Sequence, residues 1–374
     1  MKTAVLKTPA QTTPPTSKTE AETLLVGLDL GTNTSCLMAA PLGSDETTLK
    51  EQIPTVVGYV SEDVLAGIIP GDAKVLIGTA ALKYKLNVTP VRPLRGGVIH
   101  DLAAAKLFAL HLRSRLPAGS REVRAVIGMP ASSDLAARES ARAAVQGVFT
   151  KVIFVPEPFL AALGYRDESR LNYPDYRDPV LNSLYIDIGA GSTDVCLVQG
   201  HYPTIDEQLS EPFAGDAVDQ IILDRVLAAY PDCGLTLGRV REIKERHSYV
   251  LAEDAATPAV ASVMVGGKIR HLDVTAQIGT ACDILLQRVF NMTRELITRA
   301  DPESVGELLQ NVIVTGGGSL IKGFGVALQT RLLEEGFENV RVQVLGENYK
   351  DYVARGALKA AGQAKDRQWQ NLIG

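Results

Sequence analysis

The chain alternates between short apolar runs and longer segments whose apolar residues recur at helical spacing. Apolar runs at residues 124–129 and 151–155 predict buried strands. The Ala- and Arg-rich segment at residues 132–147 predicts a helix, with Ser132 or Ser133 as its N-cap. Because predicted strands and helices alternate along this part of the chain, we expect an α/β sheet with parallel strand pairs.

The second half of the chain continues the alternation. Its patterns predict helices at residues 216–229, 240–251 and 275–298, a hairpin at residues 260–274 and a strand at residues 312–314. We expect the hairpin to turn at Gly266 and Gly267, because adjacent glycines accept the backbone angles of a tight turn.

One local pattern occurs twice. Residues 26–38 read VGLDLGTNTSCLM, and residues 185–198 read YIDIGAGSTDVCLV. Each copy has an apolar strand with an Asp near its end, a Gly turn with small hydroxyl residues, and a second apolar run that contains a Cys. Each copy therefore predicts a β-hairpin. Because a spacing of about 160 residues is too long for a solenoid repeat, we expect two homologous domains that face each other.

The two turns have the composition of a phosphate-binding site. Glycine lets the main chain approach a phosphate closely, so that backbone N–H groups bind its oxygens. We expect one turn to contact each side of a triphosphate, through Gly31, Thr32, Asn33 and Thr34, and through Gly189, Gly191, Ser192 and Thr193. Asp29 and Asp187 end their strands where a hydrated Mg²⁺ would lie, since Mg²⁺ prefers few carboxylates and retained water. The alternative is two ordinary hairpin turns with capping aspartates.

Two further segments place candidate binding or catalytic residues at strand ends. Three glycines join a predicted strand to a helix and offer a flat backbone surface for an adenine ring and a phosphate. This segment contains Gly316, Gly317, Gly318 and Ser319. Glu157 also follows a predicted strand, where α/β proteins place their sites, and could orient an attacking water molecule. The alternatives are a flexible loop and a strand-ending turn.

Other nucleotide-binding motifs are missing. Gly267 and Lys268 are followed by Ile269 rather than Ser or Thr, so no Walker A motif is present. The glycines at residues 189–194 do not fit GxGxxG either. The charged segment at residues 241–246 by itself predicts a solvated helix face.

Composition narrows the class of protein. Hydrophobic residues make up 46% and charged residues 22%, as in soluble globular proteins, and the net charge of −5 argues against a general nucleic-acid binder. The four cysteines show no CxxC spacing, which suggests a reducing cytosol. No apolar stretch is long enough for a membrane span. Residues 1–22 are rich in Thr, Pro and Lys, and they predict a disordered tail without membrane insertion.

In their order and spacing, these motifs resemble the actin, heat-shock protein and sugar-kinase ATPase superfamily, and within it the bacterial actins of the MreB and MamK branch. DLGTNTS and DIGAGSTD resemble the two phosphate motifs, and VTGGGSLIKG resembles the adenosine motif. Two segments, FVPEPFLAALGY and DYVARGALKAAG, resemble the connecting helices of the family. Two others, IPTVVGY and VRPLRGGVIHD, resemble the small subdomain of MreB. The segment REIKERHSYV resembles a helix of actin. The tripeptide Glu157-Pro158-Phe159, the chain length and the polar tail are most similar to the MamK group. MreB differs in having a second glutamate at Pro156 and a hydrophobic membrane-binding element.

The resemblance implies roles for individual residues and the cofactors ATP or ADP and Mg²⁺. Asp29 and Asp187 would hold the Mg²⁺ through water and position the attacking water, and Glu157 would be the catalytic glutamate. Gly316–Gly318 would line the adenine pocket. Charged side chains of one helix would reach the ribose or adenine, namely Arg241, Lys244 and Glu245.

The resemblance also implies an α/β fold of the actin type, with two duplicated RNase H-like domains around a nucleotide cleft and a small subdomain inserted in each. After the tail at residues 1–22, the expected ranges are 23–50 with 100–178 and 346–374 for domain IA, 51–99 for subdomain IB, 179–214 with 275–345 for domain IIA, and 215–274 for subdomain IIB.

The implied function is that of a cytoplasmic bacterial actin that polymerises with itself when ATP is bound. Hydrolysis would drive filament turnover, and adaptor proteins would link the filaments to organelles such as magnetosomes or to a scaffold. A heat-shock chaperone needs a substrate-binding β-domain after the ATPase, and a sugar kinase needs more room than residues 51–99 leave. The alternative that stays open is a non-polymerising ATPase of the same fold that acts as an assembly factor or chaperone.

Overall fold

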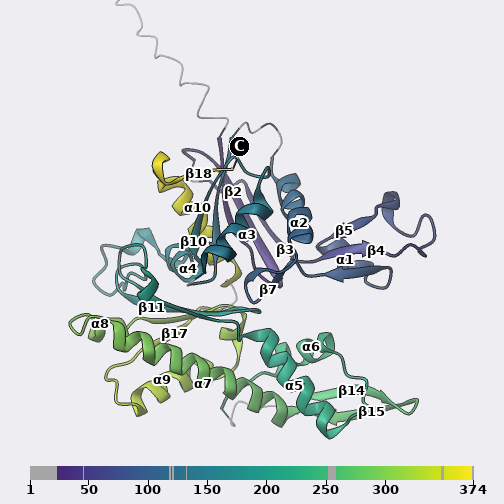
Figure 1. Ribbon diagram of the computed structural model, residues 1–374. Helices are drawn as coiled ribbons and strands as arrows, with labels where there is room; N and C mark the ends of the chain where they lie inside the picture. Colours follow the sequence, from purple (N-terminus) through teal and green to yellow (C-terminus); the bar gives the residue numbers. More distant parts are fainter. Residues whose placement is uncertain are drawn as a thin grey trace, which may run out of the picture.

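Two main sheets, each flanked by helices, form the body of the molecule (Figure 1). The computed structural model describes residues 23–44, 46–117, 119, 122–131, 133–251, 258–346 and 349–372. The predicted disordered tail, residues 1–22, lies outside the described residues. Small groups of strands extend from both halves toward the right of the view in Figure 1.

The first sheet contains the first copy of the repeated pattern. Its strands lie in the order β18-β10-β9-β1-β2-β3. Their bounds are Thr23–Asp29 (β1), Thr34–Pro41 (β2), Leu49–Pro54 (β3), Glu122–Met129 (β9), Lys151–Pro156 (β10) and Gln370–Asn371 (β18). β1, β2 and β3 form an antiparallel meander, whereas β9 pairs in parallel with β1, and β10 in parallel with β9. The predicted strand pair at residues 124–129 and 151–155 is therefore confirmed.

The second sheet repeats this topology. Its order is β13-β12-β11-β16-β17, with bounds Ser183–Ile188 (β11), Thr193–Val198 (β12), Gln208–Glu211 (β13), Val312–Thr315 (β16) and Val342–Val344 (β17). β11 to β13 form the meander, and β16 and β17 follow as parallel strands. The order β3-β2-β1-β9-β10 matches β13-β12-β11-β16-β17, and only β18 has no counterpart, so the two sequence copies are equivalent hairpins at the start of duplicated units.

Helices cover both sheets, and none in the described ranges is long and apolar enough to cross a membrane. The α-helices are Thr79–Lys83 (α1), Leu102–Arg115 (α2), Leu135–Val145 (α3), Glu157–Tyr165 (α4), Gly215–Ala229 (α5), Leu237–His247 (α6), Thr275–Arg299 (α7), Val305–Leu309 (α8), Phe324–Glu334 (α9) and Tyr349–Gln363 (α10). Short 3₁₀ turns lie at Pro70–Asp72 (η2), Glu168–Arg170 (η3), Ile205–Glu207 (η4), Gly317–Leu320 (η6) and Asp366–Gln368 (η7).

Helices α4 and α10 join the two halves. Their buried residues share one hydrophobic cluster with Val126 of the first sheet and Tyr185 of the second. The two helices pack with their backbones in contact, since a Cβ on Gly356 would overlap the carbonyl oxygen of Leu160. Only glycine permits this approach, so Gly356 determines how closely α10 packs against α4.

Small strand groups form the extensions seen at the right of Figure 1. Their bounds are Val57–Val60 (β4), Val75–Ile77 (β5), Val88–Val91 (β6), Leu94–Arg95 (β7), Val98–Ile99 (β8), Val260–Val265 (β14) and Lys268–Asp273 (β15). The β14–β15 hairpin turns at Gly266 and Gly267, both with positive φ, as predicted. The expected domain ranges stay a prediction, except that residues 51–54, predicted for subdomain IB, belong to β3 of the first main sheet.

Two predicted helix boundaries are wrong. Helix α3 begins after Asp134, whose carboxylate accepts a hydrogen bond from the Ala137 N–H at 2.7 Å. Ser132 lies outside the described residues, and the Ser133 hydroxyl instead donates to the Pro130 carbonyl. Helix α6 ends at His247 instead of residue 251, because residues 248–250 form hydrogen bonds with the main chain of Lys322.

Candidate active site between the two sheets

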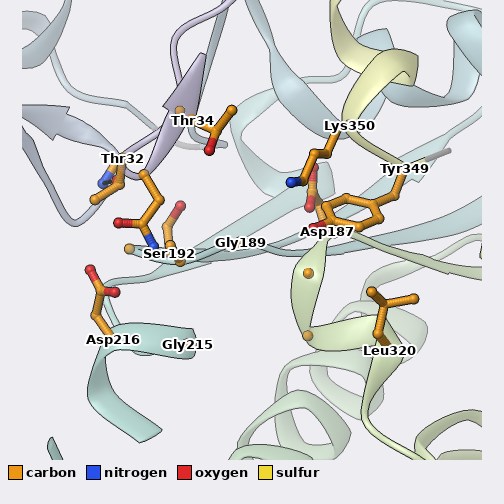
Figure 2. A pocket seen from close by; sticks show the side chains of 18 of the residues that line it. Thr32, Thr34, Asp187, Gly189, Ser192, Gly215, Asp216, Leu320, Tyr349 and Lys350 are labelled. Atoms are coloured by element: carbon orange, nitrogen blue, oxygen red, sulfur yellow. Dashed lines mark hydrogen bonds between the residues drawn. The ribbon is translucent and has the colours of Figure 1, made fainter. Parts of the chain in front are cut away.

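A cleft with a volume of about 380 Å³ lies between the two halves, within the range of small-molecule sites. In Figure 2, Thr32 and Thr34 lie at one end of the cleft and Tyr349 at the other. Most of the predicted site residues line it: Asp29, Gly31, Thr32, Asn33, Thr34, Glu157, Asp187, Gly189, Gly191, Ser192, Arg241, Lys244, Glu245, Gly316, Gly317 and Gly318.

The two Asp-Gly turns meet across this cleft. A Cβ on Gly191 of the second turn would lie 2.5 Å from the hydroxyl of Thr32 in the first turn. The Gly97 N–H donates to the same hydroxyl at 3.2 Å. Position 191 must therefore be glycine for the turns to come this close, and their backbone amides surround the space that a polyphosphate would fill.

Three aspartates gather where strands of the two sheets meet the cleft; Asp194 is buried, and Asp29 and Asp187 are half-buried. Burial raises the pKa of Asp29 to about 7. Burial, followed by the charges of Asp194 and Asp29, raises the pKa of Asp187 to about 8. Burial also raises the pKa of Asp194 to about 6, although this carboxylate accepts a hydrogen bond from the Ala131 N–H at 2.7 Å. Negative charge is thus concentrated in a region of low dielectric constant.

These carboxylates fit a hydrated Mg²⁺. Within the described ranges, no lysine or arginine is among the causes that shift the pKa values of Asp29, Asp187 and Asp194, so a cation brought by a ligand would stabilise their charged forms. The described residues contain no group of three or more His, Cys, Asp or Glu side chains that could hold a metal ion by themselves. Mg²⁺ suits such a site, because it takes few protein ligands and keeps water and phosphate oxygens.

Glu157 is the first residue of α4 and directly follows β10. Its side chain is half-buried, and desolvation, followed by the charges of Asp29, Asp194 and Asp187, raises its pKa well above the ordinary value. It lines the cleft together with Asp29 and Asp187. A raised pKa among other acids is typical of functional sites, which favours a functional role over an ordinary strand-ending turn.

The glycine run forms the floor at the other end of the cleft. Gly316 has a φ of 82°, and a Cβ there would overlap the carboxylate of Asp187. A Cβ on Gly318 would overlap the side chain of Ile188. The glycines therefore let this segment lie directly against β11, with Tyr349 and Leu320 beside it in the cleft wall. The predicted continuation as a helix is the short 3₁₀ turn η6.

A buried aspartate holds the cations of α6. Asp219 of α5 is fully buried. Its carboxylate accepts a hydrogen bond from Arg241 Nε at 2.8 Å and forms an ion pair with Lys244 Nζ at 2.7 Å. Arg241 also binds Asp216 at 2.7 Å, and Lys244 donates to the Gly215 carbonyl at 2.9 Å. These two side chains are thus built into the cleft wall, and the solvated-face alternative is wrong for them.

Two predicted binding residues have their side chains turned away from the cleft. Thr193 is buried, and its hydroxyl donates to the Phe213 carbonyl at 2.7 Å. Ser319 is also buried, and its hydroxyl donates to the Gly316 carbonyl at 2.7 Å. Neither belongs to the described residues that line the cleft. Both were included because they extend a glycine motif, but alternation along the strand and the 3₁₀ turn point them into the protein.

Sequence reasoning missed several residues of the cleft wall, including Gly97, Gly215, Asp216, Tyr349 and Lys350. Gly215 carried a usable signal, because a glycine at the start of a predicted helix leaves its backbone N–H groups open to a phosphate. Tyr349 and Lys350 carried none, since the packing of α10 alone brings the start of that helix to the cleft.

Comparisons with known proteins agree with this geometry. The family model described as MreB/Mbl protein matches residues 23–368. The actin-like protein MamK of Paramagnetospirillum magneticum is 28% identical over 358 residues, which cover 93% of this chain and 95% of that protein. The solved MamK double helical filament matches with a TM-score of 0.80 and 26% identity, over 92% of this chain and all of that chain. A non-polymerising MamK mutant bound to AMPPNP matches with a TM-score of 0.64 and 26% identity, over 91% of this chain and 99% of that chain.

The family match spans nearly all of the described residues, and the duplicated sheets around one cleft reproduce the fold of the actin-like relatives. The fold prediction is therefore confirmed. The chain belongs to the MreB/Mbl family of actin-like proteins.

Proposed function

We propose that this chain binds ATP with Mg²⁺ in the cleft, assembles with copies of itself into filaments, and hydrolyses the ATP so that the filaments turn over. The observation that carries the proposal is the meeting of two duplicated Asp-Gly turns, at Thr32 and Gly191, across one cleft. A polyphosphate between them contacts both halves of the chain, so its binding favours the closed arrangement.

The nucleotide would lie along the length of the cleft. Backbone amides of the two turns would bind the phosphates, and the Gly316–Gly318 segment, Tyr349 and the α6 side chains Lys244 and Glu245 would surround the base and ribose. A MamK mutant has been solved with AMPPNP bound, which supports an adenine nucleotide as the ligand. The cleft volume of about 380 Å³ suits such a ligand.

Hydrolysis would depend on the carboxylates at the strand ends. Asp29 and Asp187 would hold Mg²⁺ through water, and this ion would neutralise charge on the phosphates. Glu157 would accept a hydrogen bond from the attacking water and orient it toward the terminal phosphate. With the cation present, the pKa of Glu157 would fall from its raised value, so the carboxylate form that accepts a proton becomes available.

Filament formation is supported by the relatives. The chain superposes better on a subunit of the MamK double helical filament than on the non-polymerising MamK mutant, with TM-scores of 0.80 and 0.64. A head-to-tail contact that does not close into a ring gives an open filament. We place these filaments in the cytoplasm, where adaptor proteins would connect them to an organelle or scaffold.

Sedimentation and electron microscopy of the purified chain test this proposal. With Mg-ATP, the protein should pellet as filaments and release phosphate, and removal of Mg²⁺ with EDTA should abolish both. Phosphate release without any polymer at tens of micromolar protein would favour the alternative, a non-polymerising assembly factor or chaperone. Failure to bind ATP at all would contradict the proposed site itself.

A further inference from the structure

One amide oxygen in the first phosphate turn binds two arginines that come from different parts of the molecule. Asn33 Oδ1 accepts a hydrogen bond from Arg92 Nη1 at 2.6 Å and from Arg241 Nη1 at 3.2 Å. Arg92 follows β6 in the small strand group of the first half, whereas Arg241 lies on α6 of the second half. The Arg92–Asn33–Arg241 bridge therefore connects both halves through the turn that lines the cleft.

The two arginines are held very differently. Arg241 is fixed by Asp216 and Asp219, at 2.7 and 2.8 Å, so its guanidinium is rigidly placed. Arg92 forms no ion pair with any carboxylate of the described ranges, and Asn33 is its one hydrogen-bond acceptor there. Arg92 is exposed, but partial desolvation, followed by the Arg241 charge, lowers its pKa, and the Asp216 charge opposes this shift.

Arg92 is also absent from the described residues that line the cleft. Asn33 does line the cleft, so the effect of Arg92 on a bound nucleotide would pass through Asn33. Because Arg92 and Asn33 both lie in the first half, the hydrogen bond from Arg241 to Asn33 is the one that crosses the cleft and would break if the cleft opened.

We propose that Arg92 and Asn33 are positioning residues that keep the cleft closed over a bound nucleotide, with Arg241 as the fixed point on the opposite half. The inference rests on the proposed nucleotide site and adds control of nucleotide release to it. Because a hydrogen bond to a charged group contributes more than a neutral one, loss of the Arg92 contact should raise the dissociation rate of ATP about tenfold.

The test measures the release of a fluorescent ATP analogue from the full chain, in Mg²⁺ and below the assembly concentration, after a chase with excess ATP. The variants are Arg92→Gln, Asn33→Ala and the double variant. Arg95→Gln is the matched control, since Arg95 is exposed on neighbouring β7 and its loss removes the same charge. If Arg92→Gln does not fold, Arg92→Lys replaces it, because lysine keeps the charge but not the forked guanidinium.

The expected result is about tenfold faster release in each single variant, no further increase in the double variant, and wild-type release in Arg95→Gln. Association and the thermal unfolding temperature without nucleotide should change little, which separates the bridge from a general structural role. Unchanged release in Arg92→Gln would overturn the bridge. Full additivity of the two substitutions would also overturn it, since Arg92 would then act independently of Asn33. A wild-type chain that binds no analogue would instead contradict the proposed function.

Discussion

The main chain of Gly191 and the hydroxyl of Thr32 are so close that one added methyl group at Gly191 would lie 2.5 Å from Thr32 Oγ1. These residues lie in hairpin turns of different sheets, and the backbone of Gly96 and Gly97 also borders their contact. The distance between the two turns is therefore a direct measure of how far the cleft is closed.

A Gly191→Ala variant should bind ATP at least about tenfold more weakly, because the extra methyl group forces the turns apart and misplaces the amides that face the phosphates. Fluorescence titration with an ATP analogue measures this. Gly238→Ala is the matched control, since nothing lies within 4 Å of a Cβ at that position on α6. Equal affinities of the two variants would show that closure is unrelated to nucleotide binding.

A Glu157→Ala variant should still assemble with Mg-ATP, but its phosphate release should fall by about 10²–10⁴-fold, the usual contribution of a general base. Its filaments should consequently persist. Sedimentation combined with a phosphate assay separates the two properties. Glu139→Ala removes an exposed carboxylate from α3 and should behave as wild type. If Glu157→Ala released phosphate at the wild-type rate, Glu157 would have no role in hydrolysis.

Two glycines of α10 should respond in opposite directions to the same substitution. A Cβ at Gly356 would overlap the Leu160 carbonyl, so Gly356→Ala should destabilise the chain by about 3 kcal/mol or more. Nothing lies within 4 Å of a Cβ at Gly362, and there alanine should stabilise by about 0.5–1 kcal/mol. Urea unfolding gives both values. Similar effects at both positions would contradict the backbone contact between α4 and α10.

Asp219→Asn should cost about 3 kcal/mol of stability, because it leaves the cations of Arg241 and Lys244 without their fully buried counter-charge. Asp224→Asn, an exposed position on the same helix, should be neutral within experimental error. Urea unfolding of the nucleotide-free chain compares the two. A neutral Asp219→Asn variant would show that the α6 cations need no carboxylate from α5.

An ion-pair network at one end of the first sheet predicts a pH dependence. Hydrogen bonds and charges from Arg124 and Lys151 lower the pKa of Glu122 from 4.5 to about 2. Because the folded-state pKa is the lower one, this contribution is complete above pH 4.5 and is lost as the pH falls toward 2. We expect it to be about 1 kcal/mol, since water screens these partly exposed groups.

Denaturant unfolding at neutral pH and near pH 3 checks this prediction with Glu122→Gln. The variant should be less stable than wild type at neutral pH, and the difference should shrink in acid. Asp366→Asn is the control, because Asp366 binds the same Arg124 but is 87% exposed. A stability difference that stays constant with pH would exclude titration of Glu122 as its source.

The sequence predicted the parts of this protein that depend on local patterns. Alternating apolar runs gave the strands at residues 124–129 and 151–155, and the repeated Asp-Gly hairpins predicted the duplicated units, because strand faces and glycine turns leave their mark within a few residues. The same patterns identified Asp29, Asp187 and Glu157 as one site. Prediction was weaker at helix ends, as at His247, where a distant backbone segment competes for the hydrogen bonds.

Only the tertiary structure decided which distant groups share the cleft. Three features join segments that are far apart in the chain. They are the opposed turns at Thr32 and Gly191, the contact of the buried Asp219 with Arg241, and the position of Tyr349 in the cleft wall. It also decided that the Thr193 hydroxyl faces away from the cleft. The physical reason is that such contacts depend on how α4 and α10 pack between two sheets, and the packing of many side chains at once leaves no mark at any single position.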